Sequence, residues 1–472
     1  MSNNSTSKSG TQIVRALLLL VGAMMVAYAI SDHPFYGGEP GFGRLQVLVT
    51  VVGVGLAICV LLPAQISGRI LLLTVTGLVM LAVAEIAGEI VLGPRYRPIY
   101  QFDDRLIFKF IPSRRSVMTR NPRKGGETVA HRINSAGFRG DELLLAGEMT
   151  RVVVYGDSFI HAFYSPQEET FVAQLGRLLA DRIDKQVEVV NAGVSSYGPD
   201  QIVLKMEDEL PKLRPELVIV AIFAGNDYGD LMRNKIFRLA ADGALVANRW
   251  KLDRNVRVLL ELNRQESITL RALRNTLGAL RAPPDPQAGA ANMDFLLEEA
   301  AREYQNFVVE RDDIVTNTHV DHYSADVSLT PRSASARYKV ALMQAVMRRI
   351  GEVAERNDVP FAFLFIPHPL DVADGDAWGR VDRKRFPDYN GRNQIAFLEE
   401  MARVLGAPYV SLYDVFRANN ANSLYFRDGD DHWNAAGQRL AAEVMADYLL
   451  AHGLPHARGT AMRAPAHPKV MR

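Results

Sequence analysis

Three polar segments, far apart in the chain, carry side chains that together could cleave an ester. Ser158 ends a Gly-Asp-Ser sequence directly after the apolar run 151–155 (RVVVY). Asn226 follows a second apolar run, 217–222, and His432 stands in an acidic stretch near the C-terminus. A serine hydroxyl can attack a carbonyl when an imidazole takes its proton, and an amide can donate to the resulting oxyanion. The Ser158 and Asn226 segments alone are more typical of an ordinary loop or turn, and the His432 segment could be a helix cap, so the interpretation depends on their combination.

Short apolar runs that alternate with amphipathic stretches predict the frame that would position these residues. The predicted strands are 151–155, 187–190, 217–222, 361–366 and 409–412. The predicted helices lie near 168–184, 200–213, 335–357, 391–405 and 434–451. Short runs that are apolar on both faces are typical of buried parallel strands, with helices covering both sides of the sheet. Sites in such sheets form at the carboxyl ends of the strands, where Ser158 and Asn226 would both lie.

Residues 228–334 interrupt this alternation and predict a helical insertion. One helical face within it carries four leucines, Leu270, Leu273, Leu277 and Leu280, and three prolines follow it, Pro283, Pro284 and Pro286. The insertion could be a lid over the site or a peripheral subdomain. The Pro-, Arg- and His-rich stretch 453–472 is predicted to be a disordered tail.

Three long apolar runs at the start of the chain predict a membrane anchor. They cover residues 13–30, 45–62 and 70–92, and each approaches the roughly 20 residues that a spanning helix needs. We therefore expect three transmembrane helices in residues 1–92 and a juxtamembrane lead-in over 93–149. Lys8, Arg15 and Arg69 favour a cytoplasmic N-terminus, which would put the rest of the chain outside the cytoplasm, although several basic residues after the third run oppose this orientation.

The composition excludes several other kinds of protein. The chain has 54 basic and 53 acidic residues, so no global field would attract nucleic acid. Its one cysteine, Cys59, lies in an apolar run, which excludes an internal disulfide and a CxxC metal or redox site. We find no HExxH, P-loop or dinucleotide-binding glycine pattern, and we expect neither a metal nor a cofactor.

The three polar segments, in this order, resemble the SGNH hydrolase superfamily, also called GDSL esterases. The resemblance covers roughly residues 150–227 and 355–450. It implies a three-layer α/β/α, flavodoxin-like domain over 150–452, with the Ser158 hydroxyl as the nucleophile and His432 as its base. The segment 191–196 (NAGVSS) looks like the second block of the family, and 131–139 (HRINSAGFR) is similar to a lead-in of bacterial, membrane-attached members.

The resemblance also suggests the supporting residues, with some departures from the family pattern. Asp430, two residues before His432, is chosen as the triad acid, as in relatives that acetylate alginate, because Gly429 occupies the usual position. Asp431 and Asp428 are the fallbacks. The oxyanion donors would be the backbone N–H groups of Ser158 and Ser196 and the side-chain amide of Asn226. Gly193 is the alternative to Ser196, and Ala224 stands where the family has a glycine.

These features predict a membrane-anchored serine esterase that acts through a Ser-His-Asp triad. The expected substrate is an acyl ester, with acetyl preferred, of a cell-envelope glycan. Its expected location is the cell membrane, as a multi-pass protein with a periplasmic catalytic domain. The alternatives are an exopolysaccharide O-acetyltransferase served by a membrane acyl-donor partner, a lipase or lysophospholipase with a lipid substrate, and a non-catalytic glycan-binding assembly module.

Overall fold

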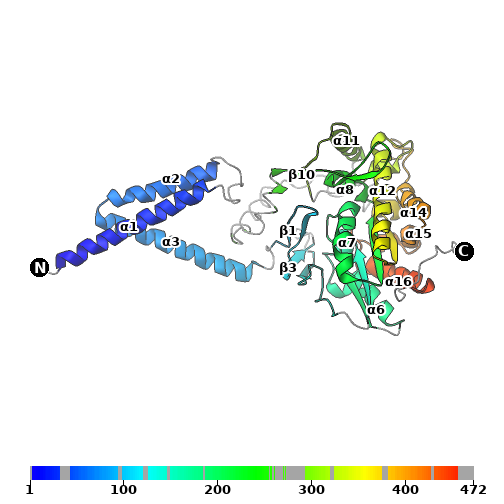
Figure 1. Ribbon diagram of the computed structural model, residues 1–472, viewed down its shortest axis with the longest axis horizontal. Helices are drawn as coiled ribbons and strands as arrows, with labels where there is room; N and C mark the ends of the chain where they lie inside the picture. The colour runs from blue at the N-terminus through cyan, green and yellow to red at the C-terminus, as the bar shows by residue number, and fades with distance from the viewer. Residues whose placement is uncertain are drawn as a thin grey trace. The chain divides into compact units, whose positions relative to one another are not determined.

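The computed structural model describes most of the chain, and the chain divides into two compact units (Figure 1). The described residues are 3–31, 43–93, 98–120, 126–145, 149–183, 186–254, 256–257, 260, 269, 272, 293–318, 324–374, 381–426 and 430–454. The first unit comprises Met1–Phe102 and Arg254–Ala282, and the second comprises Asp103–Asp253 and Pro283–Arg472. The four leucines of the insertion and all of the predicted tail after Leu454 lie outside the described residues, whereas Leu454 itself is buried.

A five-stranded parallel sheet forms the centre of the second unit. Its strands are β5 (Met149–Tyr155), β6 (Gln186–Asn191), β7 (Leu217–Phe223), β12 (Phe361–Ile366) and β13 (Tyr409–Ser411). All five lie where the sequence predicts strands. The spatial order β6-β5-β7-β12-β13 is 2-1-3-4-5 in chain order, which is the flavodoxin-like order, so the predicted α/β class is confirmed. The strand order reverses between β5 and β7, the strands that precede Ser158 and Asn226.

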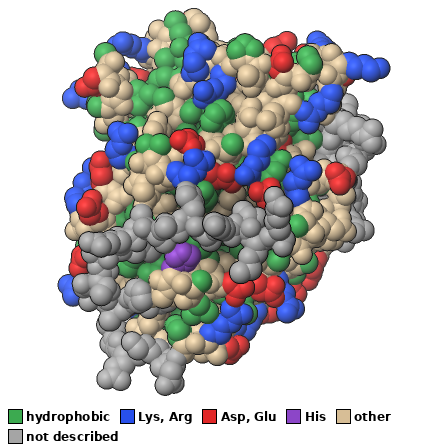
Figure 2. Space-filling model, turned by 90° about the vertical axis from the view of Figure 1, so that its right-hand side faces the viewer, with side chains coloured by type: hydrophobic (Ala, Val, Ile, Leu, Met, Phe, Trp, Pro, Cys, Tyr) green, Lys and Arg blue, Asp and Glu red, His purple; other side chains and the backbone are tan. Residues whose placement is uncertain are grey.

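Helices cover the sheet in two groups. One group pairs α6 (Phe171–Ala180) with α16 (Ala435–Ala451). The other contains α7 (Pro199–Leu213), α12 (Ala334–Arg356) and α14 (Arg392–Leu405), with α8 (Asp227–Asn234) against α7 and α12. Every residue of β7 is buried, as the all-apolar sequence LVIVAIF requires of a central strand. Basic and acidic side chains intermix on the face that Figure 2 shows, in line with a net charge of +1.

Shorter elements complete the second unit. The lead-in holds β1 (Tyr100–Asp103), where the chain passes from the first unit to the second, then β2 (Ile107–Phe110) and an antiparallel pair of β3 (Arg114–Thr119) and β4 (Thr128–Ile133). Short helical segments are α5 (Ser158–His161), η4 (Gln167–Glu169), α13 (Pro369–Val372), α15 (Tyr413–Ala418) and η7 (Ala421–Ser423).

In its described residues, the insertion after β7 contains short strands as well as helices. It contains an antiparallel pair of β8 (Phe237–Leu239) and β9 (Leu245–Ala247), and a parallel pair of β10 (Lys251–Leu252) and β11 (Ile314–Val315). Its helical parts include α11 (Met293–Tyr304), the π-helical η5 (Gln305–Val309) and η6 (Ala325–Ser328). Part of it, Arg254–Ala282, belongs to the first unit instead, where the Thr269 hydroxyl donates to the carbonyl of Ala84 at 3.2 Å.

The first unit contains three apolar helices, but only two are long enough to cross a membrane. They are α1 (Asn3–Ile30), α2 (Arg44–Ile58) with η2 (Cys59–Leu61), and α3 (Ala64–Val91). Ser9–Ile30 and Ala64–Val91 have the length and composition of a membrane span. The expectation of three spans is therefore wrong as stated, because α2 is 15 residues long and reaches roughly 22 Å, short of the roughly 30 Å hydrocarbon core.

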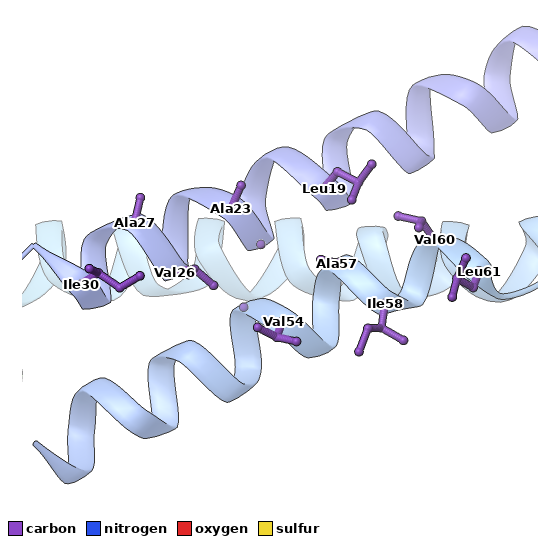
Figure 3. Close-up of a pocket in the computed structure, with 12 residues that line it drawn as sticks. Leu19, Ala23, Val26, Ala27, Ile30, Val54, Ala57, Ile58, Val60 and Leu61 are labelled. Atoms are coloured by element: carbon purple, nitrogen blue, oxygen red, sulfur yellow. The ribbon is translucent and has the colours of Figure 1, made fainter. Parts of the chain in front are cut away.

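Close backbone packing joins α1 and α2. A Cβ at Gly22 would lie 2.5 Å from the carbonyl oxygen of Gly53, so only glycine allows this crossing. An apolar groove opens beside the crossing, with Leu19, Ala23, Val26, Ala27 and Ile30 from α1, and Val54, Ala57, Ile58, Val60 and Leu61 from α2 and η2 (Figure 3). None of the most apolar window of α3 is buried, unlike a core helix of a soluble domain.

The stability of the second unit should depend on the aromatic centre of β12. Phe363 is fully buried, and its ring stacks on Phe365 at 5.7 Å between centroids. We expect Phe363→Ala to lower the free energy of unfolding by about 3–5 kcal/mol. The matched truncation Val404→Ala, at a side chain that is 62% exposed on α14, should change it by less than about 0.5 kcal/mol. Thermal unfolding midpoints of both variants test this, and equal midpoints would contradict the assigned core.

Candidate active site

Ser158 begins a helix of only four residues at the carboxyl end of β5. Gly156 permits the turn, because a Cβ there would lie 2.4 Å from Cγ1 of Ile160. The Asp157 side chain caps the helix by accepting from the backbone N–H of Phe159 at 2.9 Å. Ser158 itself is 7% exposed. The Gly-Asp-Ser sequence therefore forms a strand–turn–helix corner that places the serine above the sheet edge.

Arg139, from the lead-in, holds the far end of this short helix. Its guanidinium donates to the carbonyls of His161 and Ala162 and, at 2.6 Å, to that of Ser165. Arg139 is 3% exposed, and its own backbone N–H donates to the Asn191 carbonyl at 3.3 Å. A positive charge at a helix C-terminus is favourable, and without these bonds several buried carbonyls would lack donors.

Two further side chains complete the support of the helix. The Asn191 amide donates to the Ile160 carbonyl at 2.7 Å, and the Trp433 indole donates to the Phe159 carbonyl at 3.1 Å. Gly193 packs against the same backbone, since a Cβ there would lie 2.4 Å from the His161 nitrogen. The segments that hold Asn191 and His432 are thus both tied directly to the segment of Ser158.

His432 lies beside Ser158 and is oriented by Asp430. The two residues line the same small pocket. Nδ1 of His432 lies 2.7 Å from Oδ1 of Asp430, which also accepts the backbone N–H of His432 at 2.9 Å. The ring stacks on Phe159 at 4.9 Å between centroids. Because Asp430 binds Nδ1–H, Nε2 carries the lone pair of the neutral ring, and Nε2 is buried without a hydrogen-bond partner in the described part of the chain.

Carboxylates around the imidazole set its proton affinity. Desolvation lowers the pKa of His432, but Asp430, Asp431 and Asp157 raise it more, so that the pKa is raised to about 9. Burial by itself would raise the pKa of Asp431. His368 and His432 lower that pKa by more than burial raises it, so the pKa of Asp431 is lowered to about 2. Asp431 lies 3.4 Å from His432 Nδ1, farther than Asp430, so the geometry favours Asp430 over this fallback. Asp428 lies outside the described residues.

His368, which the sequence analysis missed, lies on the other side of Asp431. Its Nδ1 accepts the backbone N–H of Leu370 at 3.0 Å, so Nε2 carries the proton of the neutral ring. Nε2 lies 3.6 Å from Oδ2 of Asp431. His368 follows β12 directly, and a histidine at the end of a predicted buried strand was the available signal. Ligand atoms of Asp430, Asp431 and His432 lie within 4.8 Å of one another and could hold a cation, although His432 already binds Asp430.

Asn226 lies after the neighbouring strand, β7. It is 7% exposed, and its Oδ1 is buried without a hydrogen-bond partner within the described ranges. Asp227, which the sequence left without a chemical role, accepts the backbone N–H of Phe223 at 2.8 Å and so braces this turn. The Phe223 ring contacts the Phe159 ring at 4.2 Å between centroids, which joins the end of β7 to the helix of Ser158.

The 193–196 segment contacts the same helix from its other side. Ser195 Oγ lies 2.6 Å from Nδ1 of His161. Ser196 has a positive φ of 66°, and its carbonyl accepts from Arg233 at 2.6 Å. The N–H of Gly193 already donates to Asn191 Oδ1 at 3.1 Å, which counts against Gly193 as a candidate oxyanion donor.

Two buried histidines beside the site stay neutral. Burial, then His131, Arg139 and His432, hold the pKa of His161 well below its usual value. Burial and Arg139 lower the pKa of His131 to about 3, although the Phe163 carbonyl raises it. His131 and Arg139 both come from the lead-in, whose sequence was noted without a role for any of its side chains. His432 differs because carboxylates surround it.

Comparisons with known proteins add structural likeness only. No protein-family model matches the chain, and no curated protein matches it. Solved structures that it resembles include a lipolytic protein of the G-D-S-L family from Desulfitobacterium hafniense (14% identity, 64% of this chain and 99% of that chain, TM-score 0.31). A second is a lipase/acylhydrolase from Enterococcus faecalis (11% identity, 66% of this chain and 100% of that chain, TM-score 0.32). A third is an acetylxylan esterase mutant from Geobacillus stearothermophilus (11% identity, 65% of this chain and 96% of that chain, TM-score 0.32). The first of these structures carries the name of the G-D-S-L family that the motifs resemble, but TM-scores this low carry no argument.

The Arg139 contacts predict an unequal effect of two lead-in arginines. Arg139→Met should lower the free energy of unfolding by about 3 kcal/mol, because it leaves buried carbonyls without donors. Arg132→Met is the matched control, since Arg132 is half-exposed and forms only a surface ion pair with Asp141. That change should stay within about 0.5 kcal/mol. Chemical denaturation of the whole chain measures both, and equal losses would remove the assigned role of Arg139.

Proposed function

We propose that this chain is a membrane-anchored serine esterase in which Ser158 is the nucleophile, His432 its general base and Asp430 the carboxylate that orients His432. One observation carries the proposal. Ser158 and His432 line one pocket, while Asp430 binds Nδ1 at 2.7 Å and leaves Nε2 without a hydrogen-bond partner among the described residues. This arrangement gives the imidazole a fixed orientation and a free lone pair near an alcohol, which are the requirements of nucleophilic catalysis.

The reaction proceeds in two steps. Nε2 of His432 removes the proton of Ser158 as Oγ attacks the ester carbonyl, and the imidazolium that forms is stabilised by Asp430. The proton then passes to the departing alcohol as the carbon–oxygen bond of the ester breaks, which leaves an acyl group on Ser158. Water, deprotonated by His432, attacks this acyl-enzyme. The bond between the acyl carbon and Oγ then breaks, His432 returns the proton to Oγ of Ser158, and the acid is released. A sugar hydroxyl in place of water would give acyl transfer.

The oxyanion is bound by donors from three segments. They are the backbone N–H of Ser158, the backbone N–H of Ser196 and the side-chain amide of Asn226. The N–H of Gly193 is already engaged with Asn191 Oδ1, which supports the choice of Ser196 over Gly193. Each donor is worth about 3–4 kcal/mol in the transition state.

The walls of the pocket favour an ester with a small acyl group. Aromatic side chains that include Phe163, Tyr164 and Trp433 close in on Ser158 and His432, so the described residues leave no open channel for a long chain between them. Two exposed apolar helices, α1 and α3, support attachment to a membrane. An acetyl ester of a cell-envelope glycan is the substrate class that combines these features.

Removal of either reacting side chain should abolish turnover. We expect Ser158→Ala and His432→Ala in the full chain to lower kcat for p-nitrophenyl acetate by about 10³-fold or more. Ser423→Ala and His452→Ala are matched controls outside the site and should retain turnover. A fluorophosphonate should label the wild type and not Ser158→Ala. Labelling and turnover that persist in Ser158→Ala would refute the proposed mechanism.

The raised pKa of His432 predicts an alkaline pH profile. The base must be neutral, so kcat/KM should rise with pH up to about 9. The same shift stabilises the fold below the unfolded pKa of about 6.5, and this contribution is lost as the pH rises through 9. Asp430→Asn should move the midpoint to lower pH and reduce the plateau, whereas Asp414→Asn, at an exposed carboxylate, should do neither. A midpoint that does not move in Asp430→Asn would exclude Asp430 as the partner of His432.

A further inference from the structure

A second cavity adjoins the pocket of Ser158 and His432. It has a volume of about 330 Å³ and shares Tyr164, Ser165 and Phe426 with that pocket. The remaining residues that line it are Glu127, Pro166, Glu169, Asn434, Ala435 and Ala436. The volume lies at the small end of ligand sites and suits one ring-sized group rather than a long chain.

Two aromatic rings separate this cavity from the candidate nucleophile. The Tyr164 ring lies 6.1 Å from the His432 ring and 6.5 Å from the Phe426 ring, edge to face in both pairs. A backbone bond from Phe426 N–H to the His432 carbonyl, at 3.0 Å, fixes Phe426 beside the base. The Arg120 guanidinium lies 3.9 Å above the Phe426 ring. The rings are thus held in place before any ligand binds.

Two carboxylates supply the charge at the outer part of the cavity. Glu127 and Glu169 are exposed, and neither has an ion-pair partner among the residues that the structure describes. The other polar side chains are occupied, since Asn434 caps α16 and Ser165 Oγ accepts from Gln438 at 2.6 Å. A ligand would therefore meet aromatic rings on its inner side and two charged hydrogen-bond acceptors on its outer side.

This combination matches the chemistry of a neutral sugar. The C–H groups on one face of a pyranose ring can pack on aromatic rings, and its hydroxyl groups can donate to carboxylates in strong, charge-assisted bonds. The same two carboxylates repel a uronate or a phosphate, so they select by exclusion as well as by attraction. An acyl chain has no donor to offer either carboxylate.

We propose that this cavity is the subsite for a neutral sugar ring whose acyl ester lies at Ser158, and that Glu127 and Glu169 select neutral sugars over acidic ones. The inference rests on the proposed esterase function. It deepens that function, because it specifies which part of a glycan lies next to the ester and which charge that part carries.

Three substrates and the full-length chain in detergent test the subsite. They are an acetylated xylo-oligosaccharide, which is neutral, an acetylated oligogalacturonate, which is anionic, and p-nitrophenyl acetate, which lacks a sugar. We expect the wild type to have the higher kcat/KM on the neutral oligosaccharide. The double variant combines Glu127→Gln with Glu169→Gln. Its kcat/KM on the neutral oligosaccharide, divided by its kcat/KM on p-nitrophenyl acetate, should be about tenfold lower than in the wild type, because charged acceptors are lost. The ratio of the oligogalacturonate to p-nitrophenyl acetate should rise.

Controls separate the subsite from the catalytic proposal. Glu355→Gln, at an exposed carboxylate on α12 outside the cavity, should keep the wild-type preference. Tyr164→Leu should lose kcat/KM on both oligosaccharides relative to p-nitrophenyl acetate. If the double variant keeps the wild-type preference, the subsite is wrong even though the esterase proposal stands. If the wild type does not hydrolyse p-nitrophenyl acetate, the proposed function itself fails, and this inference with it.

Discussion

A four-residue helix cannot satisfy its own carbonyl groups, and the site of this protein is built around that constraint. The helix from Ser158 to His161 makes two internal backbone bonds, from His161 and Ala162. Its later carbonyls are buried, where an unpaired acceptor is costly. Arg139, Asn191 and Trp433 supply the missing donors. These three side chains come from the lead-in, the end of β6 and the C-terminal block, so one local requirement draws three distant segments to the serine.

The same contacts bring the other functional candidates into range. Trp433 adjoins His432, so the bond that supports the helix also brings the base close to Ser158. Asn191 lies five residues before Ser196 and fixes the start of that loop. The lead-in before β5 therefore acts as part of the site and not merely as a spacer after the apolar helices. This dependence explains why a buried arginine lies near a candidate nucleophile. Its guanidinium binds backbone carbonyls at the far end of the short helix and not the Ser158 side chain.

The surroundings of the histidines divide the site into two electrostatic regions. His131 and His161 lie on the Arg139 side and stay neutral, because burial and a nearby cation oppose protonation. His432 lies on the side of Asp430 and Asp431 and has a raised pKa. The Nδ1 of His161 is used by Ser195 Oγ, whereas the Nε2 of His432 remains available. Imidazoles from three parts of the chain thus differ in pKa, because their neighbouring charges differ.

The sequence alone determined the parallel sheet, its strands, and the three segments that carry Ser158, Asn226 and His432, because hydrophobic periodicity and strand-end residues are local properties. It overestimated the number of helices long enough to span a membrane. A run of apolar residues does not reveal where a helix ends, and α2 ends after 15 residues. Only the tertiary structure placed Asp430 closer than Asp431 to Nδ1 of His432, brought Arg139 to the carbonyls of the short helix and joined Tyr164 with Phe426 in one cavity. Those choices depend on distances of a few ångströms between residues far apart in the chain, which no local pattern encodes.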